Sequence, residues 1–452
     1  MSPPAAPDAR FLTGSPLRHV TVNSIYGALG FLAIFSVDLA DIFFLSLMTD
    51  ISSVAGVGFA GTLLFLPISV CIGMQISTTA NVSKAVGAGD WVCARRLAIN
   101  ALVFALVIGV VTAVIMLIIT PGALDLLGAK DRVYSQAFKY QIIMTASTPI
   151  LAVGMSLGGI LRANGDPRRA MYGAAFTAVI NALLDPLFIY LYGVEGAAYA
   201  SVVARVAMMA SHGYWVIFHH KSLSRFNANQ CTGDLAPIAK IAFSAIIASL
   251  GPPLTLLYMT YRIAPFGEEV ISGWAIIGRI IPVAFCGLFA LSSGIGPVLG
   301  QNFGGKRFDR VLRSIKSGVF VGIAYTLIVW AILAIGKDTI LFAFSASGGT
   351  MMVITFFCFW YSLSFLSESV AYVSTATYNN TGYAPIATLF GYLRIFAGVV
   401  PAVELARIEY GTLESLLMAR CLGPVAVDLL TLAVAVFLVQ RKIPRAAAST
   451  AI

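Results

Sequence analysis

Acidic side chains inside apolar runs are the residues of this sequence best suited to chemistry. Asp38 and Asp41 lie three residues apart in a long apolar run that begins near Val20, and Asp185 lies in another. On a helix, Asp38 and Asp41 would face the same side. An ionised carboxylate in the core of a bilayer costs at least a few kcal/mol. We therefore expect these acids to have a function, or a structural partner such as an arginine or the end of a broken helix.

The chemistry that these residues could perform is the binding of a small cation. Asn181 and Asp185 are four residues apart and share a helix face, and Pro186 lacks the N–H that would occupy a carbonyl of the preceding turn. Such oxygen-rich surroundings suit a proton or Na⁺. If Asp41 approaches Asp185, the two cannot both ionise cheaply and should titrate as a unit. We expect a cation site, able to hold Na⁺, at Asp41, Asn181 and Asp185. Ser201 would add a hydroxyl ligand, and Asp38 is a further candidate member of the coupling site. A polar kink at Pro186 and a packing role for Ser201 are the structural alternatives.

The composition indicates that the elements carrying these residues cross a membrane. The chain has 452 residues, of which 59% are hydrophobic and 11% charged, and its mean hydropathy is +0.89. Soluble domains carry about 25% charged residues. The net charge of +9 is typical of lysines and arginines gathered on the cytoplasmic face of a membrane protein, so we expect no nucleic-acid partner.

Twelve apolar stretches are long enough to cross a bilayer as helices, which takes about 20 residues each. They occupy residues 20–48, 53–78, 96–120, 135–160, 170–192, 194–218, 237–262, 270–298, 314–336, 350–378, 383–404 and 413–440. The sequence therefore predicts an all-α, polytopic membrane protein.

The longest polar connection divides the spans into two groups of six. We expect an N-terminal tail at 1–19, a six-helix bundle at 20–219, a linker at 220–236, a second six-helix bundle at 237–440 and a C-terminal tail at 441–452. Nineteen lysines and arginines fall on the side of both tails and six on the other side. Both termini should therefore be cytoplasmic, and the chain should be a multi-pass protein of the cell membrane, with a bacterial inner membrane expected.

Two loop signatures recur at a single offset and indicate an internal repeat. Gly87 and Gly304 are 217 residues apart, and so are Gly165 and Gly382. A repeated unit with an even number of spans keeps its orientation. The two bundles should therefore be related by a pseudo-two-fold axis along the membrane normal, as in some secondary transporters.

The repeat also predicts an asymmetry between the halves. At the offset of 217 residues Asp41 corresponds to Tyr258, and Asp185 corresponds to Ala402. The acids at these positions therefore belong to the first half alone. Glu368 lies deep in a span of the second half, and it is either a second coupling acid or the partner of a buried arginine, Arg279 or Arg394.

Cysteine and histidine give no metal-binding pattern in the sequence. The six cysteines include no C-x-x-C and lie mostly in apolar runs, so we interpret them as small hydrophobic residues. The four histidines lie near the expected membrane edges, and no phosphate-binding loop or nucleophile motif is present. We therefore expect no cofactor other than a coupling ion.

The chain resembles the MATE (multidrug and toxic compound extrusion) family of transporters over nearly its whole length. The resemblance rests on six motifs, which are VDLADIFF at 37–44, GAGD at 87–90, LRANGDP at 161–167, NALLDP at 181–186, GVEGAAYA at 193–200 and PVLGQNFG at 297–304. It implies a V-shaped pair of six-helix bundles that exports substrate in exchange for H⁺ or Na⁺.

The resemblance also implies roles for particular residues. In the DinF-like branch, which this chain resembles most, an aspartate on the first helix and an Asn-x-x-x-Asp pair on the fifth form the coupling site. These residues match Asp41, Asn181 and Asp185, and the hydroxyl of the sixth helix matches Ser201. Asp38 has no counterpart in this pattern.

One departure leaves the coupling ion open between H⁺ and Na⁺. The NorM-like branch carries acids in the seventh and tenth helices. Here the seventh has none around Tyr258, whereas Glu368 lies near the position in the tenth. We treat both residues as a possible second-half site.

The sequence favours an antiporter that exports small organic compounds, cationic or amphipathic, across the lipid bilayer by alternating access, and that acts as a monomer. The main alternative is a flippase for lipid-linked sugars of the same superfamily, because four arginines lie within spans (Arg205, Arg279, Arg394 and Arg420). We interpret Asp428 as a structural partner of Arg420 or Arg205. A membrane-embedded enzyme is a further alternative. Such an enzyme usually shows clustered His, Cys or paired acids near one membrane face; the histidines here show no such motif, and we expect no enzymatic activity.

Overall fold

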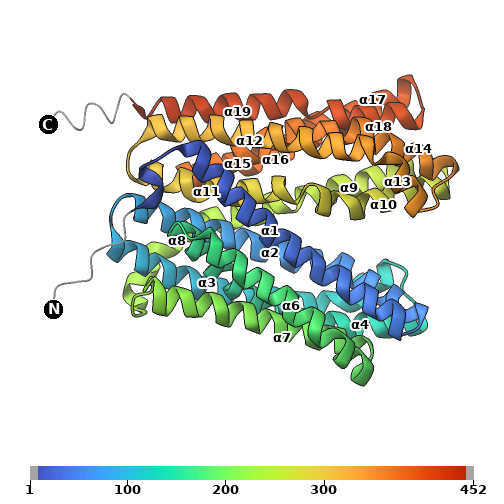
Figure 1. The fold of residues 1–452 in the computed structure, drawn as a ribbon, viewed down its shortest axis with the longest axis horizontal. Coiled ribbons are helices and arrows are strands. Elements are labelled where there is room, and N and C mark those ends of the chain that lie inside the picture. The colour runs from blue at the N-terminus through green and yellow to red at the C-terminus, as the bar shows by residue number, and fades with distance from the viewer. Residues whose placement is uncertain (1–8, 444–452) are drawn as a thin grey trace. The chain divides into compact units, whose positions relative to one another are not determined.

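The computed structural model describes residues 9–443, apart from the side chains of residues 38, 39, 42, 46, 51 and 228–232. All regular elements in this part of the chain are helices, and most of them are long (Figure 1). Nine are long and apolar enough to cross a membrane, and two bent helix pairs pass the same test. The predicted all-α, polytopic fold is confirmed.

Each of the twelve predicted spans corresponds to a helix or a group of consecutive helices. The first six are α1 (Pro16–Met48), α2 (Ile51–Gly87), α3 (Trp91–Leu126), the pair α4 (Asp131–Ala146) and α5 (Thr148–Ala163), α6 (Pro167–Tyr192), and α7 (Val194–Tyr214) with the π-helical η2 (Trp215–His219). The other six are α8 (Ala228–Ser249) with α9 (Gly251–Ile263), the pair α10 (Glu268–Ala284) and α11 (Cys286–Gly304), α12 (Phe308–Ile335), α14 (Gly348–Phe356) with η4 (Phe357–Tyr361) and α15 (Ser362–Thr381), α16 (Ala384–Leu393) with η5 (Arg394–Val399) and α17 (Val400–Glu409), and α18 (Leu413–Leu422) with α19 (Val425–Gln440).

Helix α7 is the span that hydropathy detects least well. Its 21 residues include Arg205, His212 and many small residues, which lower its mean hydropathy. The two bent pairs, α4 with α5 and α10 with α11, turn by 47° and 41°. The sequence prediction treated each of these pairs as one continuous span.

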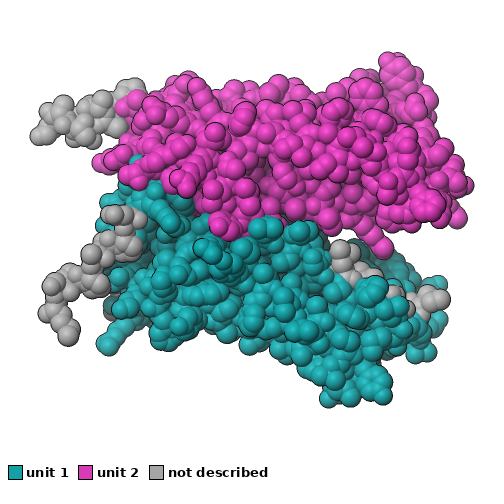
Figure 2. Space-filling view, viewed as in Figure 1, with its two compact units in different colours: residues 1–12, 29–249 teal, residues 13–28, 250–452 magenta. Residues whose placement is uncertain are grey.

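The chain divides into two compact units, coloured separately in Figure 2. Unit 1 comprises residues 1–12 and 29–249, and unit 2 comprises 13–28 and 250–452. This division differs from the predicted boundaries, since the start of α1 groups with unit 2 and all of α8 with unit 1. Specific contacts explain the difference: Asn23 Nδ2 donates to Gly294 O at 3.2 Å in unit 2, and Ser77 Oγ donates to Ile238 O at 2.7 Å in unit 1.

Close helix packing in unit 1 depends on small residues. A Cβ added to Gly73 of α2 would lie 2.4 Å from Ile246 Cγ1 of α8, and one added to Gly196 of α7 would lie 1.9 Å from Phe188 O of α6. Small residues at helix contacts let membrane helices approach closely. The close approach of α6 to α7 positions the candidate site described below.

Unit 2 is packed around α15. The rings of Phe285 and Phe365 stack with centroids 3.8 Å apart. The buried Tyr378 hydroxyl donates to Thr431 O of α19 at 2.7 Å. Aromatic stacking and a satisfied tyrosine hydroxyl together fix the position of α15 within this unit.

The backbone supports the predicted duplication at the turns. Four pairs of residues separated by 217 positions all have a positive φ, and these are Gly89 and Lys306, Gly128 and Ser345, Asp131 and Gly348, and Gly165 and Gly382. Lys306 and Ser345 adopt this conformation although a side chain disfavours it. The agreement extends the repeat beyond the glycines that the sequence revealed.

Candidate functional site

Three helices of unit 1 bring together the side chains predicted to bind a cation. Asp41 comes from α1, Asn181 and Asp185 from α6, and Ser201 from α7, and all four are buried. The structure adds Tyr140 of α4, which is also buried. The side chain of Asp38, the remaining predicted member, lies outside the described residues.

Hydrogen bonds connect the five side chains into one network. Tyr140 Oη and Ser201 Oγ each donate to Asp41 Oδ2 at 3.1 Å. Asn181 Nδ2 lies 3.2 Å from Asp185 Oδ1 and 3.3 Å from Ser201 Oγ. The carboxyl groups of Asp41 and Asp185 also lie within hydrogen-bonding range of each other.

The network leaves three buried oxygens without a hydrogen-bond donor among the described residues. They are Asp41 Oδ1, Asn181 Oδ1 and Asp185 Oδ2. Two ionised carboxylates are acceptors only and cannot bond to each other without a proton or a cation between them. Unpaired acceptors in a buried site are costly, so this arrangement favours the uptake of one positive charge.

The local sequence explains why α6 and α7 present these groups together. Helix α6 continues through Pro186 to Tyr192, which keeps Asn181 and Asp185 on one face. Gly193 has a φ of +60° and reverses the chain between α6 and α7. The reversal and the close contact at Gly196 bring Ser201 opposite Asn181.

The second half contains ion pairs at the positions where a second site was considered. Tyr258, which corresponds to Asp41 in the repeat, donates to Glu404 Oε1 at 2.9 Å. Glu404 also forms ion pairs with Arg262 and Arg407. Sequence reasoning missed Glu404 because it lies at the very end of a predicted span.

Glu368 pairs with Arg394, which was one of the two predicted arrangements. Glu368 Oε1 lies 2.9 Å from Arg394 Nη2 and 3.2 Å from Arg420 Nη2. Asp428 pairs with Arg394 at 3.0 Å, which corrects the predicted pairing with Arg420 or Arg205. Arg205 instead donates to Ser147 Oγ and to a backbone carbonyl. The four side chains of this cluster (Glu368, Arg394, Arg420 and Asp428) balance one another's charge, and all except the half-buried Arg394 are buried.

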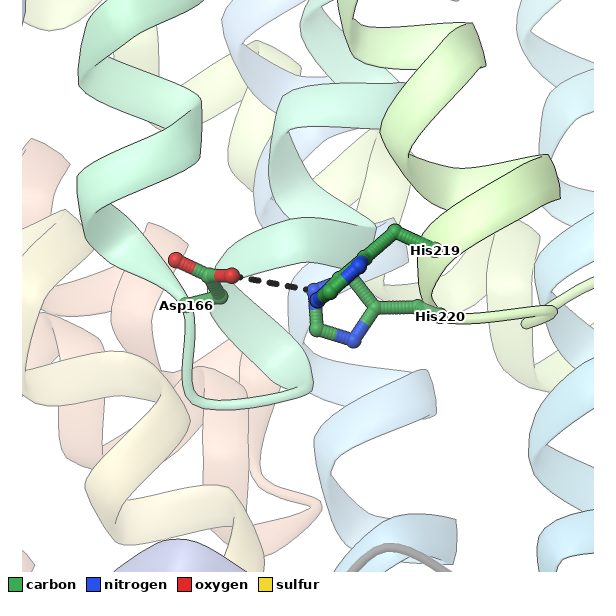
Figure 3. Close-up of side chains that lie close together, drawn as sticks. All are labelled: Asp166, His219 and His220. Atoms are coloured by element: carbon green, nitrogen blue, oxygen red, sulfur yellow. Dashed lines mark hydrogen bonds and ion pairs between the residues drawn. The ribbon is translucent and has the colours of Figure 1, made fainter.

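A third cluster, which the sequence did not reveal, joins the α5–α6 turn to the end of η2. Possible ligand atoms of Asp166, His219 and His220 lie within 4.8 Å of one another, and His220 Nε2 is 3.1 Å from Asp166 Oδ2 (Figure 3). Arg169 also forms an ion pair with Asp166. Because this guanidinium would oppose a divalent cation, we interpret the cluster as a structural contact.

Asp166 makes a testable contribution to stability. Burial raises the pKa of this carboxyl, but hydrogen bonds from His220 and Arg169 outweigh burial and lower the pKa from 3.8 to about 2. A carboxyl whose pKa is lower in the folded state stabilises the fold above its unfolded pKa and loses that contribution as the pH falls through the folded value. Asp166→Asn should therefore cost about 2 kcal/mol at neutral pH.

The measurement is unfolding of the detergent-solubilised protein and of Asp166→Asn at a series of pH values. The difference between the two proteins should be constant above about pH 5 and should shrink as the pH approaches about 2. A difference that does not change with pH would assign Asp166 a role in capping α6 rather than in charge pairing.

The burial of the cysteines agrees only partly with their interpretation as small hydrophobic residues. Cys71, Cys286, Cys358 and Cys421 are buried, whereas Cys93 is only partly buried. Cys231 lies outside the described side chains. No disulfide joins the described cysteines.

The fold defines the class of protein as a polytopic membrane protein with duplicated helical units, as in secondary transporters. The family model MatE matches residues 28–187 and 235–403. These segments make up more than half of the chain, which therefore belongs to the MATE family of transporters. The resemblance seen in the sequence is confirmed.

Individual relatives are more distant. The chain is 25% identical over 338 residues to a protein of Shewanella oneidensis described as an FAD transporter, covering 73% of this chain and 74% of that protein. It is 22% identical to the multidrug export protein MepA of Staphylococcus aureus, covering 87% and 88%. The crystal structure of the MATE transporter VcmN from Vibrio cholerae superposes with a TM-score of 0.86 at 22% identity, covering 95% of this chain and 97% of that one.

Proposed function

We propose that the protein is an antiporter that exports small organic compounds, cationic or amphipathic, in exchange for H⁺ or Na⁺. Asp41, Asn181, Asp185 and Ser201 would form the site that binds the coupling cation. The observation that carries this proposal is the pair of carboxyl groups within hydrogen-bonding range of each other, in a buried site where three oxygens have no donor among the described residues.

The mechanism follows from the electrostatics of that pair. Without a bound cation the two carboxylates repel each other in a medium of low dielectric constant. A proton between them, or Na⁺ held by both and by Asn181 Oδ1, removes the repulsion. Binding therefore changes the contacts of α1 with α6 and alters α1, with bending as one form of the change. A ligand shifts a conformational equilibrium by its difference in affinity for the two states, and here the cation would favour the state that releases substrate outward.

The substrate class is proposed from the relatives and from the charge balance of unit 2. MepA is a multidrug export protein, which supports amphipathic drugs as substrates. A flavin dinucleotide, suggested by the Shewanella protein, and a lipid-linked pyrophosphate would need uncompensated positive charge. Arg394 and Arg420 both pair with Glu368, so this observation favours cationic over anionic substrates.

The decisive experiment measures uptake into proteoliposomes with pH and Na⁺ gradients imposed separately. The panel contains cationic dyes, FAD and a lipid-linked pyrophosphate, and each is also tested after an ionophore has collapsed the gradient. We expect at least one cationic dye to accumulate severalfold above protein-free liposomes with one of the two gradients.

Other outcomes would separate the alternatives. Gradient-dependent uptake of FAD alone would replace the cationic substrate class, and movement of the lipid pyrophosphate without any gradient would support the flippase. Chemical turnover of a substrate without transport would support a membrane enzyme.

We further propose that the protein works as a monomer in a bacterial inner membrane with both termini in the cytoplasm.

A further inference from the structure

A cavity of about 400 Å³ opens at one end of unit 1, where α1, α6 and α7 meet α2 and α4. We call it the outer pocket; six of its lining residues are Asp50, Arg132, Lys139, Tyr192, Val194 and Glu195. Two ion pairs lie in its wall, between Asp50 and Arg132 and between Lys139 and Glu195, each with an N–O distance of 2.7 Å. The four charges of the pocket therefore sum to zero.

The outer pocket is aligned with the candidate cation site along four helices. On each of these helices a residue of the site and a residue of the pocket lie on the same face. The pairs are Asp41 and Met48 on α1, Asp185 and Tyr192 on α6, Ser201 and Val194 on α7, and Tyr140 and Gln136 on α4. The first three pairs are seven residues apart, which is two helical turns, or about 10 Å. The pocket and the carboxylate pair thus lie along one line within the unit.

A single layer of apolar side chains separates the pocket from the site. Leu45 follows Asp41 by four residues, Ile189 follows Asp185 by four, and Ala197 precedes Ser201 by four, so each lies one turn from the site on the same helix face. All three are buried and belong to one hydrophobic cluster, to which Tyr140 and Val194 also belong. We call Leu45, Ile189 and Ala197 the apolar layer.

We propose that the outer pocket is the vestibule through which the coupling cation reaches Asp41 and Asp185, and that the apolar layer is the gate between them. The inference rests on the proposed function of the carboxylate pair. A constriction lined by apolar side chains excludes water and ions until it widens. In the proposed orientation this end of unit 1 faces away from the cytoplasm, which is the side from which an exporter takes up its driving cation.

The ion pair between Lys139 and Glu195 allows a test of the vestibule, because removing one or the other charge should change the local cation concentration in opposite directions. Glu195→Gln leaves Lys139 unpaired and makes the pocket net positive, so it lowers the local concentration of cations. Lys139→Gln leaves Glu195 unpaired and makes the pocket net negative, so it raises the local concentration of cations. Asp50 is less suitable because it also caps α2 by accepting a hydrogen bond from Ser53 N.

The experiment measures the external concentration of protons, and separately of Na⁺, that gives half-maximal substrate transport in proteoliposomes. For the ion that drives transport, Glu195→Gln should raise this concentration and Lys139→Gln should lower it, each by about two- to fivefold. Both shifts should shrink at high ionic strength because screening weakens exposed charges. Lys316→Gln, on an exposed position of α12, is the matched control and should cause no shift.

The outcome distinguishes the vestibule from the proposed function on which it rests. If Asp41→Asn abolishes transport but the two pocket variants shift in the same direction or not at all, the vestibule is refuted and the antiporter stands. If Asp41→Asn transports normally, the coupling site itself is wrong. If the ion pair between Lys139 and Glu195 is purely structural, both pocket variants should shift the cation concentration for half-maximal transport in the same direction.

The apolar layer is tested by cysteine accessibility. A charged, membrane-impermeant thiol reagent should label Gln136→Cys in the pocket at least about tenfold faster than Ala197→Cys in the layer, with the native cysteines as background. Adding Leu45→Ala to Ala197→Cys should accelerate labelling, because the narrower side chain admits water. Equal rates for Gln136→Cys and Ala197→Cys would refute the gate.

Discussion

Asp41→Asn is expected to abolish gradient-driven efflux while the protein still folds and inserts into the membrane. The amide has nearly the shape of the carboxyl group and can still accept hydrogen bonds from Tyr140 and Ser201. It carries no ionisable proton and no negative charge, so Asp185 faces a neutral amide and the carboxylate repulsion that favours cation uptake is removed. We expect transport to fall at least about a hundredfold, since without coupling the gradient supplies no driving force.

The measurement is substrate transport in proteoliposomes under the gradient that drives the wild-type protein. Asp125→Asn is a matched control because Asp125 is an exposed acid on α3 of the same unit. Folding is checked by the elution of monodisperse protein and by thermal unfolding in detergent. Normal efflux by Asp41→Asn would end the proposed mechanism.

Glu368→Gln is expected to destabilise the protein strongly. Glu368 forms ion pairs with Arg394 and Arg420, and all three side chains are at most one-fifth exposed. Removing one partner of a buried ion pair leaves an uncompensated charge, which costs about 3–5 kcal/mol. Thermal or denaturant unfolding in detergent measures this loss, with Glu409→Gln at an exposed position of α17 as the control.

A double variant tests whether charge balance is the cause. Glu368→Gln together with Arg420→Gln leaves Arg394 and Asp428 as a neutral pair, so the double variant should be more stable than Glu368→Gln alone. If Glu368→Gln is as stable as the wild type but loses transport, Glu368 is a coupling acid rather than a structural partner, and the second-half site must be reconsidered.

The spans could be predicted because they are apolar, but the unit to which each helix belongs could not. A span needs about 20 apolar residues, and all twelve predicted stretches are found as helices or consecutive helices. The same apolar character does not specify which unit a helix packs on. Contacts such as Ser77 with Ile238 place α8 in unit 1, and they involve residues far apart in the sequence.

The candidate site could be predicted where its signal was local. Asn181 and Asp185 are four residues apart in an apolar run, and their hydrogen bond follows from that spacing. Tyr140 lies in a mixed polar stretch of α4 with no pattern that singles it out. Asp166 and His220 are 54 residues apart, so only the fold brings them together.

The left-handed turns shared by the two halves indicate which feature of the chain the repeat preserves. Lys306 and Ser345 keep a backbone conformation that costs a residue with a side chain roughly 1 kcal/mol, whereas their counterparts in the first half are glycines. The two halves therefore share the path of the main chain at these corners even where the residues that form the corner differ.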